Sequence, residues 1–364
     1  MGPLLGVERA TSATEVCAHF RALATPCLNV VAADRDGRVL YQASGSLPWR
    51  GEDPGPGPLP GDGRHEWRGF LAHDRLPAWQ VPPSGVVVNC NNRPMSAVFG
   101  EPLPRYDRPQ DRALAIAGRL EPLPRVSLAD LRDIQNDVDS RGARRMLPRL
   151  LACADSVPER WTPRMRQALD TLRRWDDVAA RGRVAPTLYR GWYGALQRRS
   201  KLDGLIGLTA AALEGKAPEA LVAPDPAGGT GATPERPAVA AVAALALALD
   251  SLTVLLGPDL TRWTWERAHR AAFRSDLAGR PGAWQPPPTP MDGDNSTPSV
   301  GASRLPWTTV VTHGPVFRHL VDLAVTDSSL GILPPGNSGA RRSPHLLDHL
   351  ARWADHRYVP FYLS

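Results

Sequence analysis

The clearest pattern along the chain is a pair of apolar runs on either side of Asp34-Arg35-Asp36-Gly37, within residues 28–41. Two such runs around an Asp-Gly turn predict a β-hairpin. Gly45 and Pro48 are expected to end the second strand. Four bulky apolar residues further along are expected to pack onto this sheet: Trp67, Phe70, Leu71 and Trp79.

Another short strand is predicted over Val86–Val88, and side-chain amides follow it at Asn89, Asn91 and Asn92. An amide NH2 group fixed at the end of a strand is the type of donor that stabilises a developing oxyanion in acyl transfer. Asn residues also commonly satisfy the backbone of turns. The residues alone therefore leave two interpretations open, Asn89 or Asn91 as an oxyanion donor, or turn residues without a catalytic role.

Helical spacing of apolar residues then predicts a helix over residues 112–120. Two N-terminal capping patterns follow, a capping box at Ser127–Asp130 and a cap before proline at Thr162-Pro163. Helices are expected to continue to about Arg274, interrupted by an exposed linker at residues 224–237 that is rich in Pro and Gly.

Beyond residue 283 the apolar positions recur at every second residue, which predicts strands. The predicted strands and the expected last helix are Val300–Ser303, Trp307–Thr312, Phe317–Leu323 and His345–Trp353. Strands, then helices, then strands that rejoin the first sheet predict an α+β fold. The chain thereby falls into a sheet-forming part with the Asn cluster, a mostly helical part, and a part with the returning strands and the last helix: residues 1–125, 126–283 and 284–364.

Composition excludes several classes of protein. The 364 residues are 42% hydrophobic and 22% charged, which is ordinary for a globular protein. The net charge of +6 comes from scattered Arg residues, with Lys only at Lys201 and Lys216, so nucleic-acid binding is not predicted. The longest apolar run, Ala238–Leu249, is shorter than a membrane span and ends at Asp250, which predicts a buried helix and no membrane association. Residues 1–5 show no secretory signal.

Other candidate residues are interpreted as structural. The Cys residues lack metal-ligand or disulfide spacing and are expected to be buried apolar side chains: Cys17, Cys27, Cys90 and Cys153. His313 and His345 are interpreted as core or hydrogen-bonded histidines. Residues 292–296 are interpreted as a loop, because no Glu completes a calcium site there, and Ser338 as part of a turn.

Taken together, a colinear series of segments resembles the penicillin acylase (penicillin amidase) family of N-terminal nucleophile hydrolases. The segments that carry the resemblance are residues 33–37, 45–50, 67–71, 84–93, 112–116, 130–140, 147–151, 263–269, 314–323, 335–339, 343–345 and Trp353. The resemblance implies part of an αββα sandwich with a large helical insertion. It also implies hydrolysis of a linear amide by an N-terminal Ser whose own α-amino group acts as the base.

The resemblance implies roles for two residues of this chain. Asn91 matches the family's side-chain oxyanion donor, and Arg112 matches the family's Arg that gives electrostatic support near the nucleophile. No residue of the chain matches the nucleophile, since Gly45-Ser46 matches a strand-ending element instead. No cofactor is implied, although a structural calcium ion is allowed in the complete family assembly, with most of its ligands absent from this chain.

The chain is therefore expected to be the C-terminal part of a large subunit, one incomplete domain that is inactive alone. Three explanations stay open: a truncated or split reading frame, a chain that complements a separate N-terminal segment, or a non-catalytic descendant. The expected partners are that missing segment and an acyl amide such as a β-lactam, an acyl-homoserine lactone or a lipopeptide. The alternative function is a scaffold, assembly or binding protein that keeps the fold. Localisation is left open, although relatives are often exported.

Overall fold

The computed structural model describes residues 2–49, 59–81, 85–92, 110–202, 237–273, 285–311 and 313–362. The chain divides into two compact units. Unit 1 comprises residues 1–121 and 322–326, and unit 2 comprises residues 122–321 and 327–364. The boundaries expected from the sequence, after residues 125 and 283, stay predictions.

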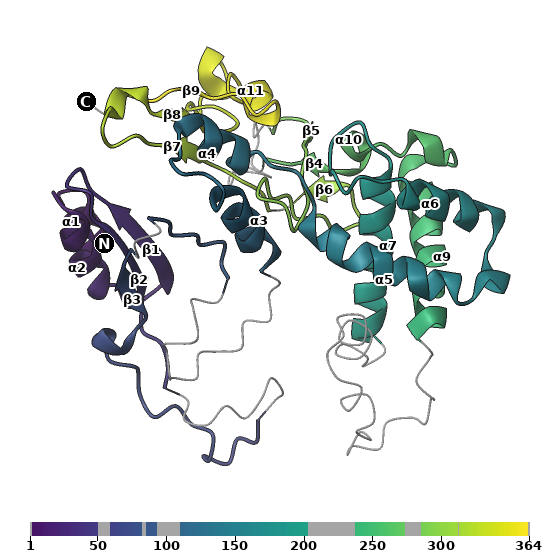
Figure 1. The fold of residues 1–364 in the computed structure, drawn as a ribbon, viewed down its shortest axis with the longest axis horizontal. Coiled ribbons are helices and arrows are strands. Elements are labelled where there is room, and N and C mark those ends of the chain that lie inside the picture. Colours follow the sequence, from purple (N-terminus) through teal and green to yellow (C-terminus); the bar gives the residue numbers. More distant parts are fainter. Residues whose placement is uncertain are drawn as a thin grey trace. The chain divides into compact units, whose positions relative to one another are not determined.

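Unit 1 is built around a three-stranded antiparallel sheet in the order β1-β2-β3. Its elements are α1 (Gly2–Val7), α2 (Ala13–Arg21), β1 (Leu28–Ala33), β2 (Val39–Ser44), a 3₁₀ helix (His73–Arg75), β3 (Ala78–Gln80) and α3 (Asp111–Leu120). The predicted hairpin is confirmed, and so is the helix predicted over residues 112–120. Figure 1 shows α2 beside the sheet, where it contacts β1 and β2.

The Asp34 side chain ties the hairpin turn to the start of α2. Its Oδ1 accepts hydrogen bonds from the backbone N–H groups of Asp36 and Arg38 at 3.1 and 3.0 Å. Its Oδ2 accepts from the Ala13 N–H at 3.1 Å. Burial acts to raise the pKa of Asp34, but these hydrogen bonds outweigh it and hold the pKa below its ordinary value. Gly37, with φ of 82°, supplies the left-handed residue that the turn requires.

Helix α2 was not anticipated from the sequence, although a local signal exists. Ser12 caps it, since its Oγ accepts a hydrogen bond from the Glu15 N–H at 3.2 Å, and the Glu15 carboxylate accepts from the Thr11 N–H at 2.8 Å. A Ser followed three residues later by Glu is the signature of a helix start. The helix covers one face of the sheet, where Val30 and Ala32 are buried.

Two expectations for unit 1 were wrong. Val86–Val88 lies in no strand, because no described segment pairs with its backbone, and a strand forms only with a neighbouring one. Trp67 and Phe70 are 57% and 58% exposed, so they are not packed into the sheet, and their rings contact each other. Trp79 does pack on the sheet, since its ring stacks on that of Tyr41 at a centroid distance of 3.9 Å.

Unit 2 combines a helical cluster with two small sheets (Figure 1). Its described α-helices are α4 (Leu128–Gln135), α5 (Arg141–Asp155), α6 (Pro163–Arg173), α7 (Ala185–Leu202), α9 (Pro237–Leu256), α10 (Trp265–Ala268) and α11 (Leu350–Ala354). Its described strands are β4 (Arg270–Ala271), β5 (Thr289–Pro290), β6 (Val310–Val311), β7 (Arg318–Leu320), β8 (Leu330–Ile332) and β9 (Val359–Pro360). Short 3₁₀ helices are Pro158–Arg160, Leu260–Arg262 and Pro344–Leu346.

The capping predictions for unit 2 are confirmed. The Ser127 Oγ accepts from the Asp130 N–H at 3.2 Å while the Asp130 carboxylate accepts from the Ser127 N–H at 2.8 Å, which is a complete capping box at the start of α4. Thr162 caps α6 through its Oγ1, which accepts from the Met165 N–H at 3.2 Å, and proline occupies the first turn.

Helix α9 is the centre of the helical cluster. It packs against α5 and α7, and the Trp192 indole of α7 donates a hydrogen bond to the Ala241 carbonyl of α9 at 2.7 Å. The buried helix expected over Ala238–Leu249 is therefore confirmed, but the length argument was wrong. The helix continues past Asp250 to Leu256, and residues 238–256 are long and apolar enough to cross a membrane. Half of that stretch is buried inside the unit, as in a core helix.

The later part of the chain departs from the sequence-based expectations. Among the described residues, the strands after residue 283 do not pair with β1, β2 or β3. Strands β5 and β6 flank the earlier strand β4, and β7, β8 and β9 form a separate sheet. The expected strand at Val300–Ser303 is wrong, because its backbone N–H groups bond separately to the carbonyls of Pro298, Asp294 and His313 instead of to one neighbouring strand. The expected helix over 345–353 is split into a 3₁₀ turn and α11, and the helical region ends at Ala268, before β4.

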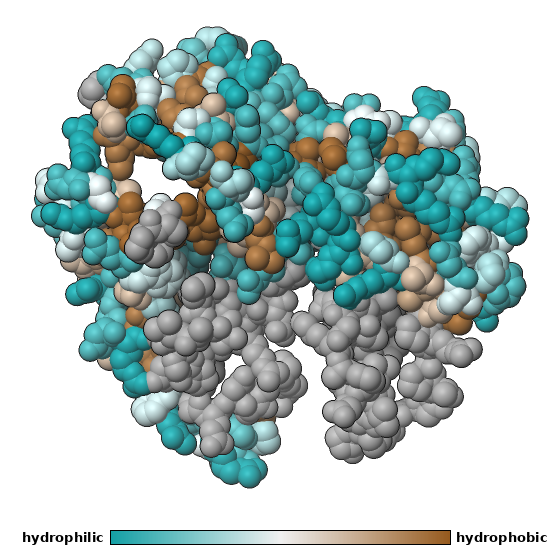
Figure 2. All heavy atoms as spheres, in the orientation of Figure 1, coloured by the Kyte–Doolittle hydropathy of each residue, from teal (hydrophilic) through white to brown (hydrophobic). Residues whose placement is uncertain are grey.

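The β7-β8-β9 sheet carries exposed aromatic side chains. Phe317 stacks on His319, and Phe361 packs edge-on against the same imidazole across Gly331. Figure 2 shows hydrophobic atoms at the surface where Figure 1 places these strands. The sheet therefore leaves part of its apolar surface in contact with solvent.

Candidate functional site

The Asn cluster forms a tight bend at residues 90–91, after residues 85–89, which have no regular secondary structure. The Asn91 N–H donates to Asn89 Oδ1 at 3.2 Å, and the Cys90 N–H donates to Asn92 Oδ1 at 2.8 Å. Asn91 itself has φ of 61°, a left-handed conformation that Asn adopts more readily than most residues. Asn89 and Asn92 thus hold the backbone of the turn, which leaves Asn91 as the carboxamide that this turn does not use.

Arg112, the second residue of α3, contacts this bend. Its Nη2 donates to the Cys90 carbonyl at 2.6 Å and to Asn91 Oδ1 at 3.3 Å. A guanidinium group has only donors, so the carboxamide atom facing it is the oxygen. The Asn91 Nδ2 then lies at the other end of the amide, and nothing within the described residues accepts a hydrogen bond from it. The structure therefore brings together the two residues that the sequence singled out.

The chemistry of this pair is that of an oriented donor. The positive charge of Arg112 polarises the Asn91 amide through its oxygen, which makes the NH2 group a stronger donor. A side-chain amide with one end fixed and the other end free can stabilise negative charge that develops on a carbonyl oxygen. Asn91 is held on a bend by backbone and side-chain contacts, so its donor is preorganised.

Cys90 does not supply a nucleophile to this site. Burial raises the pKa of its thiol, although the charge of Arg112 acts in the opposite direction. A thiol of raised pKa stays protonated near neutral pH, and the thiolate is the reactive form. Cys90 is therefore a neighbour of the candidate donor and not an attacking group.

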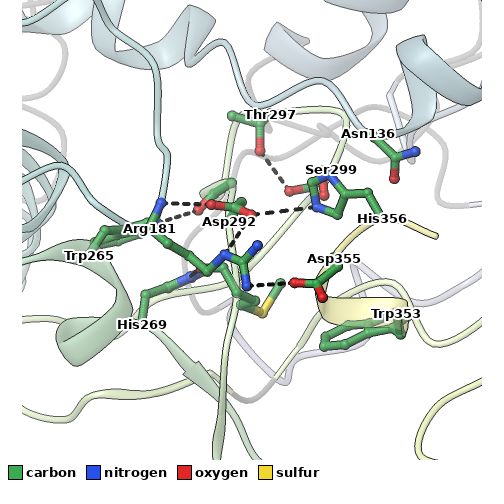
Figure 3. Close-up of polar contacts among 12 residues, drawn as sticks. Asn136, Arg181, Trp265, His269, Asp292, Thr297, Ser299, Trp353, Asp355 and His356 are labelled. Atoms are coloured by element: carbon green, nitrogen blue, oxygen red, sulfur yellow. Dashed lines mark hydrogen bonds and ion pairs between the residues drawn. The ribbon is translucent and has the colours of Figure 1, made fainter. Parts of the chain in front are cut away.

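A second group of polar side chains lies in unit 2 (Figure 3). The Arg181 Nε contacts Asp292 Oδ2 at 3.0 Å, and its Nη1 contacts Asp355 Oδ1 at 3.1 Å. Asp292 Oδ1 also accepts from the Arg181 N–H at 2.7 Å. Burial, together with the charge of Arg318, lowers the pKa of His356 to about 4, so its 3.8 Å contact with Asp292 is not an ion pair at neutral pH.

This group joins distant parts of unit 2 instead of forming an open site. Arg181 precedes α7, Asp292 follows β5, and Asp355 follows α11. Each of these charged groups faces a partner of opposite charge, and Asp292 is the least exposed of the three. We therefore assign the group to the stability of unit 2. This group could not be predicted from the sequence, because Arg181 and Asp292 are separated by 111 positions.

Residues 292–296, which resemble part of a calcium loop, also make their polar contacts within unit 2. Asp294 is fully buried, and its carboxylate accepts from the Ser140 hydroxyl at 2.7 Å and from the Ser296 N–H at 2.7 Å. The interpretation of residues 292–296 as a loop is confirmed. Within the described ranges no group of three or more His, Cys, Asp or Glu residues is arranged to hold a metal ion.

The remaining sequence candidates give mixed outcomes. His345 is hydrogen-bonded, with its Nδ1 2.9 Å from Asp348 Oδ2, but His313 is exposed, so the core interpretation is wrong for it. The Ser338 Oγ accepts from the Ala340 N–H at 3.1 Å, which is a turn contact. Cys17 is buried as expected, whereas Cys27 is exposed because it lies in the loop before β1.

Comparisons with known proteins place this chain among the penicillin acylases and their relatives. The sequence profile of the penicillin amidase family matches residues 1–364. Penicillin acylase 2 proenzyme of Pseudomonas sp. strain SE83 is 29% identical over 92% of this chain and 44% of the relative. An acyl-homoserine lactone acylase, QuiP, of Pseudomonas aeruginosa is 26% identical over 98% of this chain and 46% of the relative. The chain thus spans about half the length of the curated relatives it matches.

The fold is similar to that of a solved enzyme. A thermostable penicillin G acylase from Alcaligenes faecalis matches with a TM-score of 0.60 at 20% identity, covering 100% of this chain and 69% of that one. At this identity the likeness shows the fold. It agrees with the mixed helix-and-sheet architecture, and it establishes the α+β penicillin acylase fold that the sequence predicted.

Proposed function

Because this chain belongs to the penicillin amidase family, we propose that it contributes the oxyanion donor to an enzyme that hydrolyses a linear amide. The observation that carries the proposal is the contact between Arg112 and the Asn91 side-chain oxygen at 3.3 Å. It leaves the amide NH2 group of Asn91 as the donor on a fixed bend. The relatives support an acylase activity through their names, which describe a penicillin acylase and an acyl-homoserine lactone acylase.

In the proposed reaction a nucleophilic hydroxyl attacks the amide carbonyl, and the carbonyl oxygen becomes negatively charged in the tetrahedral intermediate. The Asn91 NH2 group donates a hydrogen bond to that oxygen. The amine then leaves, and water hydrolyses the acyl ester to a carboxylic acid. One oxyanion donor of this kind contributes about 3–4 kcal/mol to transition-state stabilisation.

Arg112 has two proposed roles at this site. Through Nη2 it holds the Cys90 carbonyl at 2.6 Å, which fixes the bend, and it fixes the orientation of the Asn91 amide. Its positive charge also offsets negative charge that develops nearby. Lys would keep the positive charge but not the planar guanidinium that directs Nη2 toward both oxygens, so Lys is expected to replace Arg112 poorly.

The proposed nucleophile is an N-terminal Ser on a segment that this sequence does not contain. Two observations support this part of the proposal. The family resemblance assigns none of this chain's Ser residues to the nucleophile, and the chain covers 44% and 46% of the two acylases compared above. The name of the Pseudomonas relative describes it as a proenzyme, which is in keeping with a nucleophile freed by processing. The proposed reaction uses no cofactor.

The test is to produce this chain with and without its upstream reading frame and to assay a chromogenic phenylacetyl amide and a long-chain acyl amide. We expect hydrolysis only when the additional segment is present. Hydrolysis by the 364-residue chain alone would contradict the proposed place of the nucleophile. A stable assembly of the two segments without hydrolysis of either amide would favour the alternative function, a non-catalytic scaffold or binding protein.

A further inference from the structure

Unit 1 contains a pocket that is separate from the Asn91–Arg112 pair. It has a volume of about 240 Å³ and lies between the end of α2, the bend after β2 and the segment before β3. The residues that line it are Arg21–Ala24, Gly45, Ser46, Leu71 and His73. Neither Asn91 nor Arg112 is among them.

Two cationic or donor groups at this pocket have no partner among the described residues. Arg21, the last residue of α2, forms no ion pair or hydrogen bond within the described part of the chain. The Nε2 of His73 is buried and has no hydrogen-bond partner. A buried polar atom without a partner is costly, and its cost is removed when a ligand supplies the missing group. Ser46 adds a hydroxyl to the same lining.

Two backbone carbonyls near the end of α2 already accept hydrogen bonds from strand β2. The Gln42 Nε2 donates to the Cys17 carbonyl at 3.1 Å, and the Ser44 hydroxyl donates to the Phe20 carbonyl at 2.6 Å. The carbonyl end of a helix otherwise carries partial negative charge and repels anions. Side chains of strand β2 therefore satisfy two carbonyls near the end of α2, which reduces the negative potential that this helix end presents to an anion.

We propose that this pocket binds a carboxylate group, with Arg21, His73 and Ser46 as its donors. The guanidinium plane of an Arg matches the two oxygens of a carboxylate, and a His nitrogen that carries a proton adds a third donor. The volume accepts a small organic acid or the C-terminal residue of a polypeptide. The proposal goes beyond the amide hydrolysis above and does not rest on it, since it uses none of the same residues.

The test is a ligand-observed NMR titration of the full chain with acetate, inorganic phosphate and a dipeptide with either a free or an amidated C-terminus. Acetate is expected to bind, and to bind more tightly than phosphate. Arg21→Gln and His73→Leu are each expected to weaken acetate binding about tenfold, the effect of losing a charge-assisted or buried hydrogen bond. Arg35→Gln removes the same charge from the exposed hairpin turn and is the matched control.

The two sources of a carboxylate are distinguished by the peptides. A free dipeptide that binds more tightly than acetate, with an amidated one that does not bind, identifies a polypeptide C-terminus as the ligand. A dipeptide that binds no better than acetate identifies small acids. Equal acetate affinity in Arg21→Gln, His73→Leu and Arg35→Gln, all folded by circular dichroism, would overturn the proposal. So would phosphate binding as tightly as acetate.

Discussion

The helical cluster of unit 2 and the hairpin sheet of unit 1 differ in how much apolar surface each buries by itself. In unit 2, α5, α6, α7 and α9 enclose a single large core with several fully buried aromatic rings. In unit 1, the buried cluster consists of Ala13, Cys17 and Ala32, with Val16 and Leu40 packed against it. The candidate oxyanion donor therefore lies in the unit with the smaller core.

The two units also differ in the support given to their backbone. The capped helices α5 and α6 pack on each other and on α9, and they hold the core of unit 2. The segment that carries Asn91 belongs to no strand and is held by the bend contacts and by Arg112. The larger core therefore lies in unit 2, whereas the candidate oxyanion donor lies in unit 1. Substitutions in the two units are thus expected to have separable effects.

The largest expected effect tests the core of unit 2. Trp192 is fully buried, and Trp192→Ala is expected to lower the free energy of unfolding by about 3–5 kcal/mol through the cavity it leaves. Val31, on β1 of unit 1, is 48% exposed, and Val31→Ala is expected to cost less than about 0.5 kcal/mol. Denaturant titration followed by circular dichroism measures both. Equal losses of unfolding free energy in the two variants would contradict the difference in burial between the units.

Two helical glycines, one in each unit, provide a second test, because replacing them by Ala is expected to change the free energy of unfolding in opposite directions. A Cβ at Gly194 of α7 would overlap the Leu305 carbonyl oxygen, so Gly194→Ala is expected to destabilise by about 3 kcal/mol. Gly118 of α3 has open space around it, and Gly118→Ala is expected to stabilise by about 0.5–1 kcal/mol. Thermal unfolding of both variants gives the signs, and a stabilising Gly194→Ala would contradict the tight packing of α7.

Acid is expected to weaken unit 2 through His269. Burial lowers the pKa of this imidazole to about 4, outweighing its contacts with the Met291 and Gly301 carbonyls. Its neutral form therefore stabilises the fold above the ordinary His pKa, and that contribution is lost as pH falls toward 4. The expected loss between pH 7 and pH 5 is about 2 kcal/mol.

Urea titrations at pH 7 and pH 5 measure this contribution. His269→Gln should remove it, because Gln does not titrate. His313→Gln, at an exposed position, is the control and should leave the pH dependence of the parent chain unchanged. A His269→Gln variant with the same pH dependence as the parent would show that another group causes the loss.

The smallest expected effects test whether the two units differ in their local signals. Ser12 caps α2 of unit 1, and Ser127 caps α4 of unit 2, each through a 3.2 Å hydrogen bond from a backbone N–H. Ser12→Ala and Ser127→Ala are each expected to cost about 1 kcal/mol. Similar losses, measured by hydrogen exchange of each helix, would show that the units differ in burial and not in capping. A loss at Ser127 alone would place the difference in the local signals.

Local signals explain which elements could be predicted from the sequence. The Asp34–Gly37 turn, the Ser127–Asp130 capping box and the Thr162 cap each act within a few residues, and each forms as expected. Elements that depend on distant partners were mispredicted. Val86–Val88 and Val300–Ser303 have the composition of strands, but composition does not say whether a neighbouring strand exists.

The candidate site could be predicted in its residues but not in its geometry. The resemblance to the family identified Asn91 and Arg112 as candidate site residues. The Asn-rich stretch also indicated a turn. The contact between the two side chains links positions 21 residues apart, and no periodicity encodes it. The different roles of the three Asn residues could also be assigned only from the structure. Asn89 and Asn92 accept hydrogen bonds from the backbone of the turn, whereas Asn91 is left as a donor.

The most direct test of the central claim is the kcat of Asn91→Ala in the complete assembly, measured on the amide that the assembly hydrolyses. The account predicts a fall of about 10²–10³-fold with an unchanged circular dichroism spectrum and unfolding midpoint. Asn295→Ala, which removes an exposed carboxamide of unit 2, is the control and should keep the parent kcat. An Asn91→Ala assembly that turns over as fast as the Asn295→Ala control would contradict the claim that Asn91 stabilises the oxyanion.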